Sequence, residues 1–279
     1  MSELGHLEAI LLGAVQGLTE FLPVSSSGHL AIIQRWMGLV PDSPPMLLFD
    51  VLAHLGTLGA VLVVFAPQIR RFADRLAREC RRDWKGRRWG WRIALLGLAA
   101  TIPTAAVGLS QQGFFEEKFN DPSWIGGCLI ATGLMLAMLV SLGRARRGWR
   151  QFQVWQAALV GFAQAAAILP GISRSGATIC VARYCGLRRR WAAEFSFLIA
   201  APAILGGAIL KTGDVLSLPA DELSSLRWTP ILVGSVVSFL VGVIALRWLL
   251  GMVRRAKLHY FAAYCWLLGA AVLTGILWP

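Results

Sequence analysis

Two short polar stretches interrupt an otherwise apolar chain, and their residue types suit a phosphoryl group. One lies in residues 16–29 and the other in residues 170–178. Arginine is the usual bidentate partner of phosphate. Serines and glycines that follow a helix break leave backbone N–H groups at the start of the next helix, where an anion is favoured. The candidate site residues are Gln16, Glu20, Ser25, Ser26, Ser27, His29, Ser173, Arg174, Ser175, Gly176 and Thr178.

Four of these residues are expected to do chemistry. Arg174 would neutralise phosphate charge, while Glu20 and His29 could move protons. Ser26 could attack phosphorus with Glu20 or His29 as its base, or it could hold an oxygen while water attacks directly. The remaining residues of the set are expected to bind the substrate.

Each residue type also has an ordinary structural explanation. Serines in membrane helices often hydrogen-bond to backbone carbonyls, and a lone arginine can extend to the membrane interface. A glutamate can be the structural ion-pair partner of that arginine, and a lone histidine is usually structural. A charged side chain at membrane depth costs at least about 2.5–3.5 kcal/mol, and here acid, hydroxyl, imidazole and arginine occur together. We therefore favour the functional explanation. For His54, inside an apolar stretch, we favour packing.

The composition predicts a protein that crosses a membrane several times. Of 279 residues, 56% are hydrophobic and only 15% are charged, whereas about a quarter are charged in soluble domains. The net charge of +12 does not indicate nucleic acid, because the basic residues cluster at the ends of apolar stretches. The five cysteines show no metal-ligand or disulfide spacing.

The apolar stretches predict an all-α fold of six transmembrane helices and two re-entrant helical hairpins. Six stretches are long enough to cross ~30 Å of hydrocarbon, namely residues 47–66, 92–111, 124–142, 192–211, 228–248 and 258–278. Residues 6–34 and 152–182 are apolar but broken by Pro, Gly, Ser and charged residues. Such segments must line a cavity or be buried in protein. The two polar stretches lie in these hairpins, so we expect their tips to meet.

The charges between the spans predict orientation. Most of the 27 Lys and Arg residues lie in residues 67–92, 143–152, 183–191 and 247–257, whereas the loops 112–123 and 212–227 carry acidic residues. The basic loops are therefore expected in the cytoplasm, with the acidic loops and both chain ends outside. The Arg-rich loop 67–92 is also expected to contact anionic lipid.

An internal repeat relates two halves, residues 1–146 and 147–279, of what we predict to be a single membrane domain. At an offset of 148 residues, without gaps, the matched pairs are Gly13–Gly161, Gln16–Gln164, Ser25–Ser173, Ser27–Ser175 and Gly28–Gly176. Each half then holds one broken hairpin and three spans. Because three crossings take the chain to the other side of the membrane, the second half starts from the opposite side and is inverted relative to the first. Inverted repeats with broken helices are a known way to build a site near the bilayer midplane.

The polar stretches resemble the two signature segments of the undecaprenyl-diphosphatase family, whose members are also called bacitracin-resistance proteins. The two segments read QGLTEFLPVSSSGHL and PGISRSGAT. The phrases FDVLAHLGTL and EFSFLIAAPAILGG resemble the adjoining spans of that family. The resemblance extends over essentially the whole chain, and the paired motifs are long and specific.

The resemblance implies a multi-pass enzyme of the bacterial inner membrane with an active site open to the periplasmic side. It would convert undecaprenyl diphosphate, an isoprenoid diphosphate lipid, to undecaprenyl phosphate for reuse in peptidoglycan synthesis. The resemblance implies roles for Glu20, Ser26, His29 and Arg174, and a divalent cation, Mg²⁺ or Ca²⁺, that Glu20 would help to hold. Other members can carry Glu at the position of Gln16. Because Gln16 has no charge, it cannot act as an ionised ligand or base, and these roles fall mainly to Glu20.

Two other functions stay open at this point. A transporter or flippase of a lipid-linked phosphate would also use inverted repeats, whereas a non-catalytic membrane scaffold would leave the buried polar residues unexplained. The sequence predicts contact with membrane lipids and no nucleic-acid partner. It leaves the oligomeric state open, a homodimer included.

Overall fold

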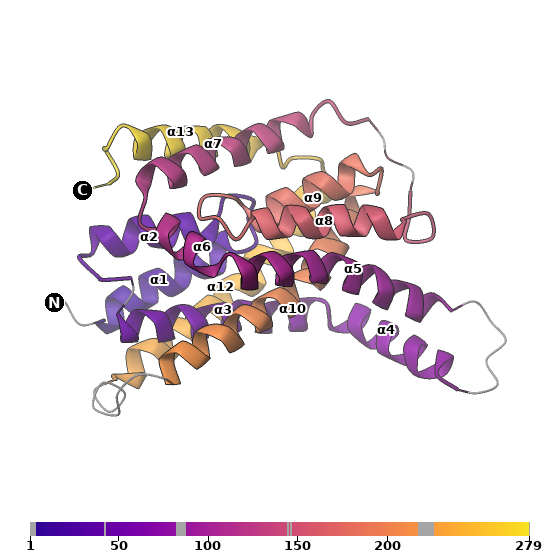
Figure 1. Cartoon of the computed structure of the whole chain (residues 1–279), viewed down its shortest axis with the longest axis horizontal. Coiled ribbons are helices and arrows are strands. Elements are labelled where there is room, and N and C mark those ends of the chain that lie inside the picture. Colours follow the sequence, from indigo (N-terminus) through magenta and orange to yellow (C-terminus); the bar gives the residue numbers. More distant parts are fainter. Residues whose placement is uncertain are drawn as a thin grey trace.

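The computed structural model describes residues 4–41, 43–81, 88–143, 145, 147–216 and 226–278, which form helices joined by turns and loops (Figure 1). One isolated β-bridge joins Arg147 and Leu187. The all-α class predicted from the sequence is confirmed for these residues. The helices are α1 (His6–Thr19), α2 (Ser26–Trp36), α3 (Pro44–Val64), α4 (Ala66–Glu79), α5 (Trp89–Ser110), α6 (Gln112–Phe119), α7 (Pro122–Met138), α8 (Val154–Ala166), α9 (Arg174–Tyr184), α10 (Arg189–Leu216), α12 (Trp228–Arg254) and α13 (Tyr260–Leu273).

Four helices of the described part are long and apolar enough to cross a bilayer: α3, α5, α10 and α12. They coincide with four of the six predicted spans. The predicted span 124–142 coincides with α7, which has 17 residues and reaches spanning length only together with α6, across a 93° bend. The predicted span 258–278 coincides with α13, which has 14 residues. The chain is therefore a multi-pass membrane protein, and the count of six spans stays a prediction.

Each segment predicted as a hairpin is a pair of helices separated by a break. α1 and α2 are separated around Pro23, because proline lacks the N–H that would continue a helix. Ser25 adopts φ 69°, a left-handed conformation rare outside glycine, and its side chain caps α2. α8 and α9 are separated by a turn in which Gly171 adopts φ 96°, and Ser173 caps α9.

The helices that carry the polar breaks lie against long helices from the other half of the chain. α1 lies along α12, and α8 lies along α5. A Cβ atom added to Gly13 of α1 would lie 2.2 Å from the Gly234 carbonyl oxygen in α12. One added to Gly161 of α8 would lie 2.3 Å from the Ala100 carbonyl oxygen in α5. A side chain cannot occupy either position without moving a helix, so these two glycines set how closely the helices approach.

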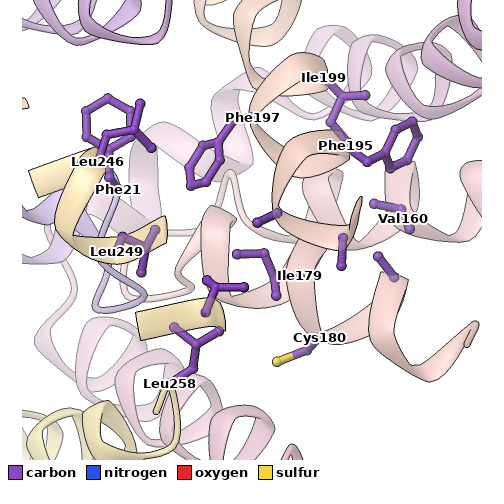
Figure 2. Packing of buried hydrophobic residues seen from close by; sticks show 14 of the residues in the cluster. Phe21, Val160, Ile179, Cys180, Phe195, Phe197, Ile199, Leu246, Leu249 and Leu258 are labelled. Atoms are coloured by element: carbon purple, nitrogen blue, oxygen red, sulfur yellow. The ribbon is translucent and has the colours of Figure 1, made fainter. Parts of the chain in front are cut away.

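Apolar side chains fill the space beside the breaks (Figure 2). Phe21, just after α1, lies edge-to-face with Phe197 of α10, with ring centroids 5.9 Å apart. Phe65 packs on the same ring at 5.8 Å. Ile179 of α9 and Leu249 of α12 belong to the same buried cluster. Lipid tails are as apolar as these side chains, so the cluster stabilises the fold through close packing and not through removal from water.

Two helices lie in segments that are predicted as loops from the sequence. α4 occupies the first half of the Arg-rich segment 67–92, and α6 lies in the acidic segment 112–123. In α4, Ile69, Phe72 and Leu76 are half-buried at helical spacing while the arginines are exposed. The prediction of a plain loop is wrong here, because basic residues mark a side of the membrane without reporting the local backbone structure.

Replacing Gly13 by Ala is expected to lower the thermal unfolding midpoint of the purified protein in detergent. The added methyl group would meet the Gly234 carbonyl oxygen, and overpacking of this kind costs about 1–3 kcal/mol. Gly97→Ala in α5 is the matched control, since a Cβ atom there meets nothing within 4 Å. Equal midpoints for the two variants would contradict the close contact between α1 and α12.

Candidate active site

Glu20 is the centre of the polar contacts between the two broken helix pairs. Its Oε1 accepts a hydrogen bond from Arg174 Nη2, which comes from α9. Its Oε2 accepts from Ser26 Oγ at 2.6 Å and from Gln16 Nε2 at 3.1 Å. Glu20 is 8% exposed. A buried carboxylate requires such a partner, and here an arginine from the other half of the chain supplies it.

Ser25 locks the two breaks together. Its hydroxyl accepts the N–H of Gly28 at 3.4 Å, which caps α2, and the N–H of Gly171 at 3.0 Å, which belongs to the other break. A Cβ atom on Gly28 would lie 3.4 Å from Gly171 Cα, so the two backbones are in contact. Ser27 Oγ lies 3.3 Å from Ser25 Oγ. The first serine cluster therefore holds the tip of one hairpin against the other.

The second break makes the corresponding contacts. Ser173 caps α9 by accepting the N–H of Gly176 at 3.1 Å, and Ser175 Oγ lies 3.3 Å from Ser173 Oγ. Thr178 Oγ1 lies 2.5 Å from Ser196 Oγ, a contact that ties α9 to α10. The predicted substrate-binding hydroxyls of this stretch are thus buried and engaged within the protein, and binding of substrate by them stays a prediction.

His29 lies in the first turn of α2, but its ring is directed toward α13. Its Nδ1 donates to the Ser25 carbonyl oxygen at 2.7 Å, since a carbonyl can only accept. Its Nε2 lies 2.7 Å from the Tyr264 hydroxyl, and the two rings stack with centroids 5.7 Å apart. Both ring nitrogens are therefore engaged away from Glu20 and Ser26. Nε2 is the nitrogen that can exchange a proton.

Two residues outside the predicted set, His54 and Tyr264, reach the site. His54 of α3 places its Nε2 3.8 Å from Glu20 Oε2, while its Nδ1 donates to the Asp50 carbonyl oxygen at 2.7 Å. Tyr264 of α13 holds His29. Packing alone therefore does not explain His54. Its position inside an apolar span was the feature of the sequence that could have indicated a place in the site. Tyr264 gave no signal, because an aromatic residue in an apolar helix is ordinary.

The donors beside Glu20 fit a divalent cation best when a phosphate ligand is also present. No three His, Cys, Asp or Glu side chains gather as a ligand group in the part of the chain that the structure describes. Glu20 supplies one carboxylate, and the neighbouring Gln16 Oε1 is buried without a hydrogen-bond partner. Mg²⁺ usually takes one or two carboxylates together with substrate phosphates. Glu20 and Gln16 therefore suit a cation that arrives with a phosphate.

The arrangement can transfer a proton and bind an anion. The Ser26 hydroxyl, 2.6 Å from a carboxylate oxygen, has the geometry to give up its proton. Arg174 also donates from Nη1 to the Ala200 carbonyl oxygen at 3.3 Å. A guanidinium has five N–H donors, so further donors remain for a phosphate. A phosphoryl group at this position would meet a hydroxyl, a base and a positive charge.

Known proteins resemble this chain over nearly its whole length. Residues 9–271 match the family described as Bacitracin resistance protein BacA. The undecaprenyl-diphosphatase of Carboxydothermus hydrogenoformans is 41% identical over 270 residues, covering 97% of each chain. The proteins of the same name from Desulfatibacillum aliphaticivorans and Syntrophotalea carbinolica are each 43% identical, covering 96% and 95% of this chain and 97% of each relative.

Removal of the arginine charge is expected to destabilise the protein. Arg174→Met removes the guanidinium from the buried Glu20 carboxylate, and the loss of one partner of a buried ion pair costs about 3–5 kcal/mol. The double variant Glu20→Gln/Arg174→Met should recover most of the lost stability, because no buried charge remains. Thermal unfolding in detergent measures both variants.

Lys118→Met is the control for this experiment. It breaks an ion pair with Glu117, whose side chain is 71% exposed, so the carboxylate left behind stays solvated and the unfolding midpoint should shift little. A double variant no more stable than Arg174→Met would mean that Arg174 does not compensate the Glu20 charge.

Proposed function

The chain belongs to the BacA family of bacitracin resistance proteins, and from this premise we propose that it hydrolyses undecaprenyl diphosphate to undecaprenyl phosphate and inorganic phosphate. The relatives named above are undecaprenyl-diphosphatases. One observation carries the proposal. Glu20 accepts a hydrogen bond from the Ser26 hydroxyl, and Arg174 of the other hairpin forms an ion pair with the same carboxylate. A lipid-linked diphosphate combines a phosphoryl group suited to this site with a tail soluble in the bilayer.

We assign Ser26 as the nucleophile and Glu20 as its base. As Ser26 Oγ bonds to the terminal phosphorus, its proton passes to Glu20 Oε2, and the bond between that phosphorus and the bridging oxygen breaks. Undecaprenyl phosphate leaves with the bridging oxygen. Water then cleaves the phosphoserine, which restores the Ser26 hydroxyl and releases inorganic phosphate. In the alternative, water attacks directly with Glu20 as base, and Ser26 binds a phosphate oxygen.

Charge neutralisation is the second part of the proposed mechanism. Arg174 and the N-terminal amides of α2 and α9 would bind the phosphate oxygens, where negative charge grows in the transition state. His29 would carry protons through its Nε2. The Tyr264 hydroxyl beside that nitrogen belongs to a residue that is 46% exposed, so the pair links the buried tip to the molecular surface.

The proposal places the site within the bacterial inner membrane, open to the periplasm, with six spans and two re-entrant hairpins. Contacts that recur at the offset of 148 residues support two inverted halves: the serine caps at Ser25 and Ser173, and the close helix approaches at Gly13 and Gly161. The isoprenoid tail would stay in lipid between the spans. The product would return to the carrier pool for peptidoglycan synthesis.

Two substitutions test the assigned roles by phosphate release from undecaprenyl diphosphate in detergent. Glu20→Gln should lower the rate at least about 100-fold, since general base catalysis contributes about 10²–10⁴. Ser26→Ala should lower it by a similar factor, and acid quenching of the wild-type reaction should trap phosphorylated Ser26. Glu117→Gln is the control. The Glu117 side chain is 71% exposed on α6, so this substitution should leave the rate of phosphate release unchanged.

The outcomes of this assay separate the alternatives. Activity retained in Ser26→Ala without any phosphoserine would select direct attack by water. Unchanged release by Glu20→Gln would contradict the proposed site. A wild-type protein that moves lipid phosphate across vesicles but releases no phosphate in detergent would be a transporter.

Mg²⁺ or Ca²⁺ would be held by Glu20, the Gln16 amide oxygen and the diphosphate together, and when bound it would offset the charge of the phosphate oxygens. Chelation with EDTA should therefore stop phosphate release, and added Mg²⁺ should restore it. Gln16→Glu should lower the Mg²⁺ concentration for half-maximal release, because it adds a second carboxylate. Tight Mg²⁺ binding by the wild type without diphosphate, measured by calorimetry, would contradict a cation that arrives with the substrate.

A further inference from the structure

α4 lies beside the long helices as an amphipathic helix, with four exposed arginines and half-buried Ile69 and Phe72. Helices of this kind lie in the membrane interface. At its end, Glu79 accepts the N–H of Gly90 at 2.8 Å and of Trp91 at 3.1 Å, at the start of α5. Burial acts to raise the pKa of Glu79, but these N–H groups outweigh it and hold the pKa below its usual value. The ionised carboxylate therefore fixes α4 to α5.

A cavity of about 670 Å³ lies between α4, α5 and α10, and Figure 1 shows α4 at the right of the molecule. Much of its wall is apolar, with Ile93 of α5 and Phe195, Leu198 and Ile199 of α10. The charged residues that line it are Arg71, Asp74, Arg75, Arg78, Arg190 and Glu194. A cavity that is apolar on one side and basic on the other suits an amphiphilic ligand.

A second cavity of about 400 Å³ adjoins the first. The residues that line both are Arg75, Ile93, Trp149 and Trp191. The second cavity adds Arg150, Arg188 and Trp89, and the Arg150 guanidinium lies 5.0 Å from the centroid of the Trp89 ring. Six arginines and two carboxylates line the two cavities together, so the pair carries net positive charge.

We propose that the two cavities together bind one anionic glycerophospholipid of the surrounding bilayer. Its phosphate would lie at Arg75, Arg150 and Arg188, and one acyl chain would lie against the apolar wall of the larger cavity. The net positive charge favours an anionic headgroup over a zwitterionic one. Tryptophan is typical of the level at which headgroups lie, which matches three tryptophans around this cavity pair. The site is separate from the hairpin tips, so it does not depend on the proposed hydrolysis.

α10 connects the lipid site to the candidate active site. Its Phe195 and Ile199 line the larger cavity, whereas the carbonyl oxygen of Ala200 accepts a hydrogen bond from Arg174. A lipid packed against this stretch of α10 would restrain the backbone that positions the arginine. Binding is therefore expected to raise the stability of the whole chain.

Native mass spectrometry and thermal unfolding of the purified whole chain test the proposal. Phosphatidylglycerol added to the detergent should stay bound and raise the unfolding midpoint more than phosphatidylethanolamine with the same chains. Arg75→Gln/Arg150→Gln should weaken phosphatidylglycerol binding at least about ten-fold, because charged hydrogen bonds to the phosphate are lost. Arg254→Gln/Arg255→Gln is the matched control, since both arginines are exposed and line neither cavity, and it should bind like the wild type.

Gly97→Phe is a second variant that keeps every arginine. Gly97 lines the larger cavity and a Cβ atom there meets nothing within 4 Å, so the ring should occupy the space of the acyl chain and block binding. Equal binding of the two lipids, or phosphatidylglycerol binding unchanged in both variants, would overturn the proposal. Displacement of phosphatidylglycerol by an equal concentration of undecaprenyl phosphate would also overturn it, because the cavities would then take a polyprenyl phosphate.

Discussion

The structure depends on one buried ion pair that joins the two halves of the chain. The Glu20 carboxylate cannot leave water at acceptable cost without a positive partner, and that partner, Arg174, lies 154 residues later. Neither hairpin tip is neutral on its own. The contact from the Gly171 N–H to Ser25 brings the backbones together at the same place. The arrangement that could do chemistry is therefore also the one that requires both halves to be in place.

Helix packing determines where the tips meet. In lipid, helices gain little from hiding one apolar surface against another, so association depends on fit and on hydrogen bonds. Gly13 and Gly161 allow backbone contact between α1 and α12 and between α8 and α5. Thr132 of α7 donates to the Gly171 carbonyl oxygen at 2.9 Å and accepts the Ser173 N–H at 3.0 Å. The non-helical backbone at this break thus finds partners inside the protein, as a bilayer demands.

The sequence predicted the breaks and the central pair because their causes are local. A proline such as Pro23 and a capping serine such as Ser173 interrupt a helix wherever the rest of the chain lies, and an isolated charge in an apolar segment calls for a partner. Apart from the place of His54 in an apolar span, nothing local indicates that His54 or Tyr264 reaches the site, because both approach the tips through the packing of α3 and α13. The number of spans is equally hard to predict, because the length of a short apolar helix such as α13 does not report its depth or tilt.

The charge balance at the tips connects the fold to the proposed reaction. Glu20 and Arg174 cancel each other, and Gln16 adds no charge, so a diphosphate would bring an excess of negative charge that Arg174 and a cation must share. Transfer of the Ser26 proton to Glu20 would remove the carboxylate charge just as negative charge grows on the phosphate oxygens. The same step would activate the nucleophile and free Arg174 to interact fully with the phosphate. On this mechanism the ion pair that stabilises the resting protein also supplies the positive charge that the transition state needs.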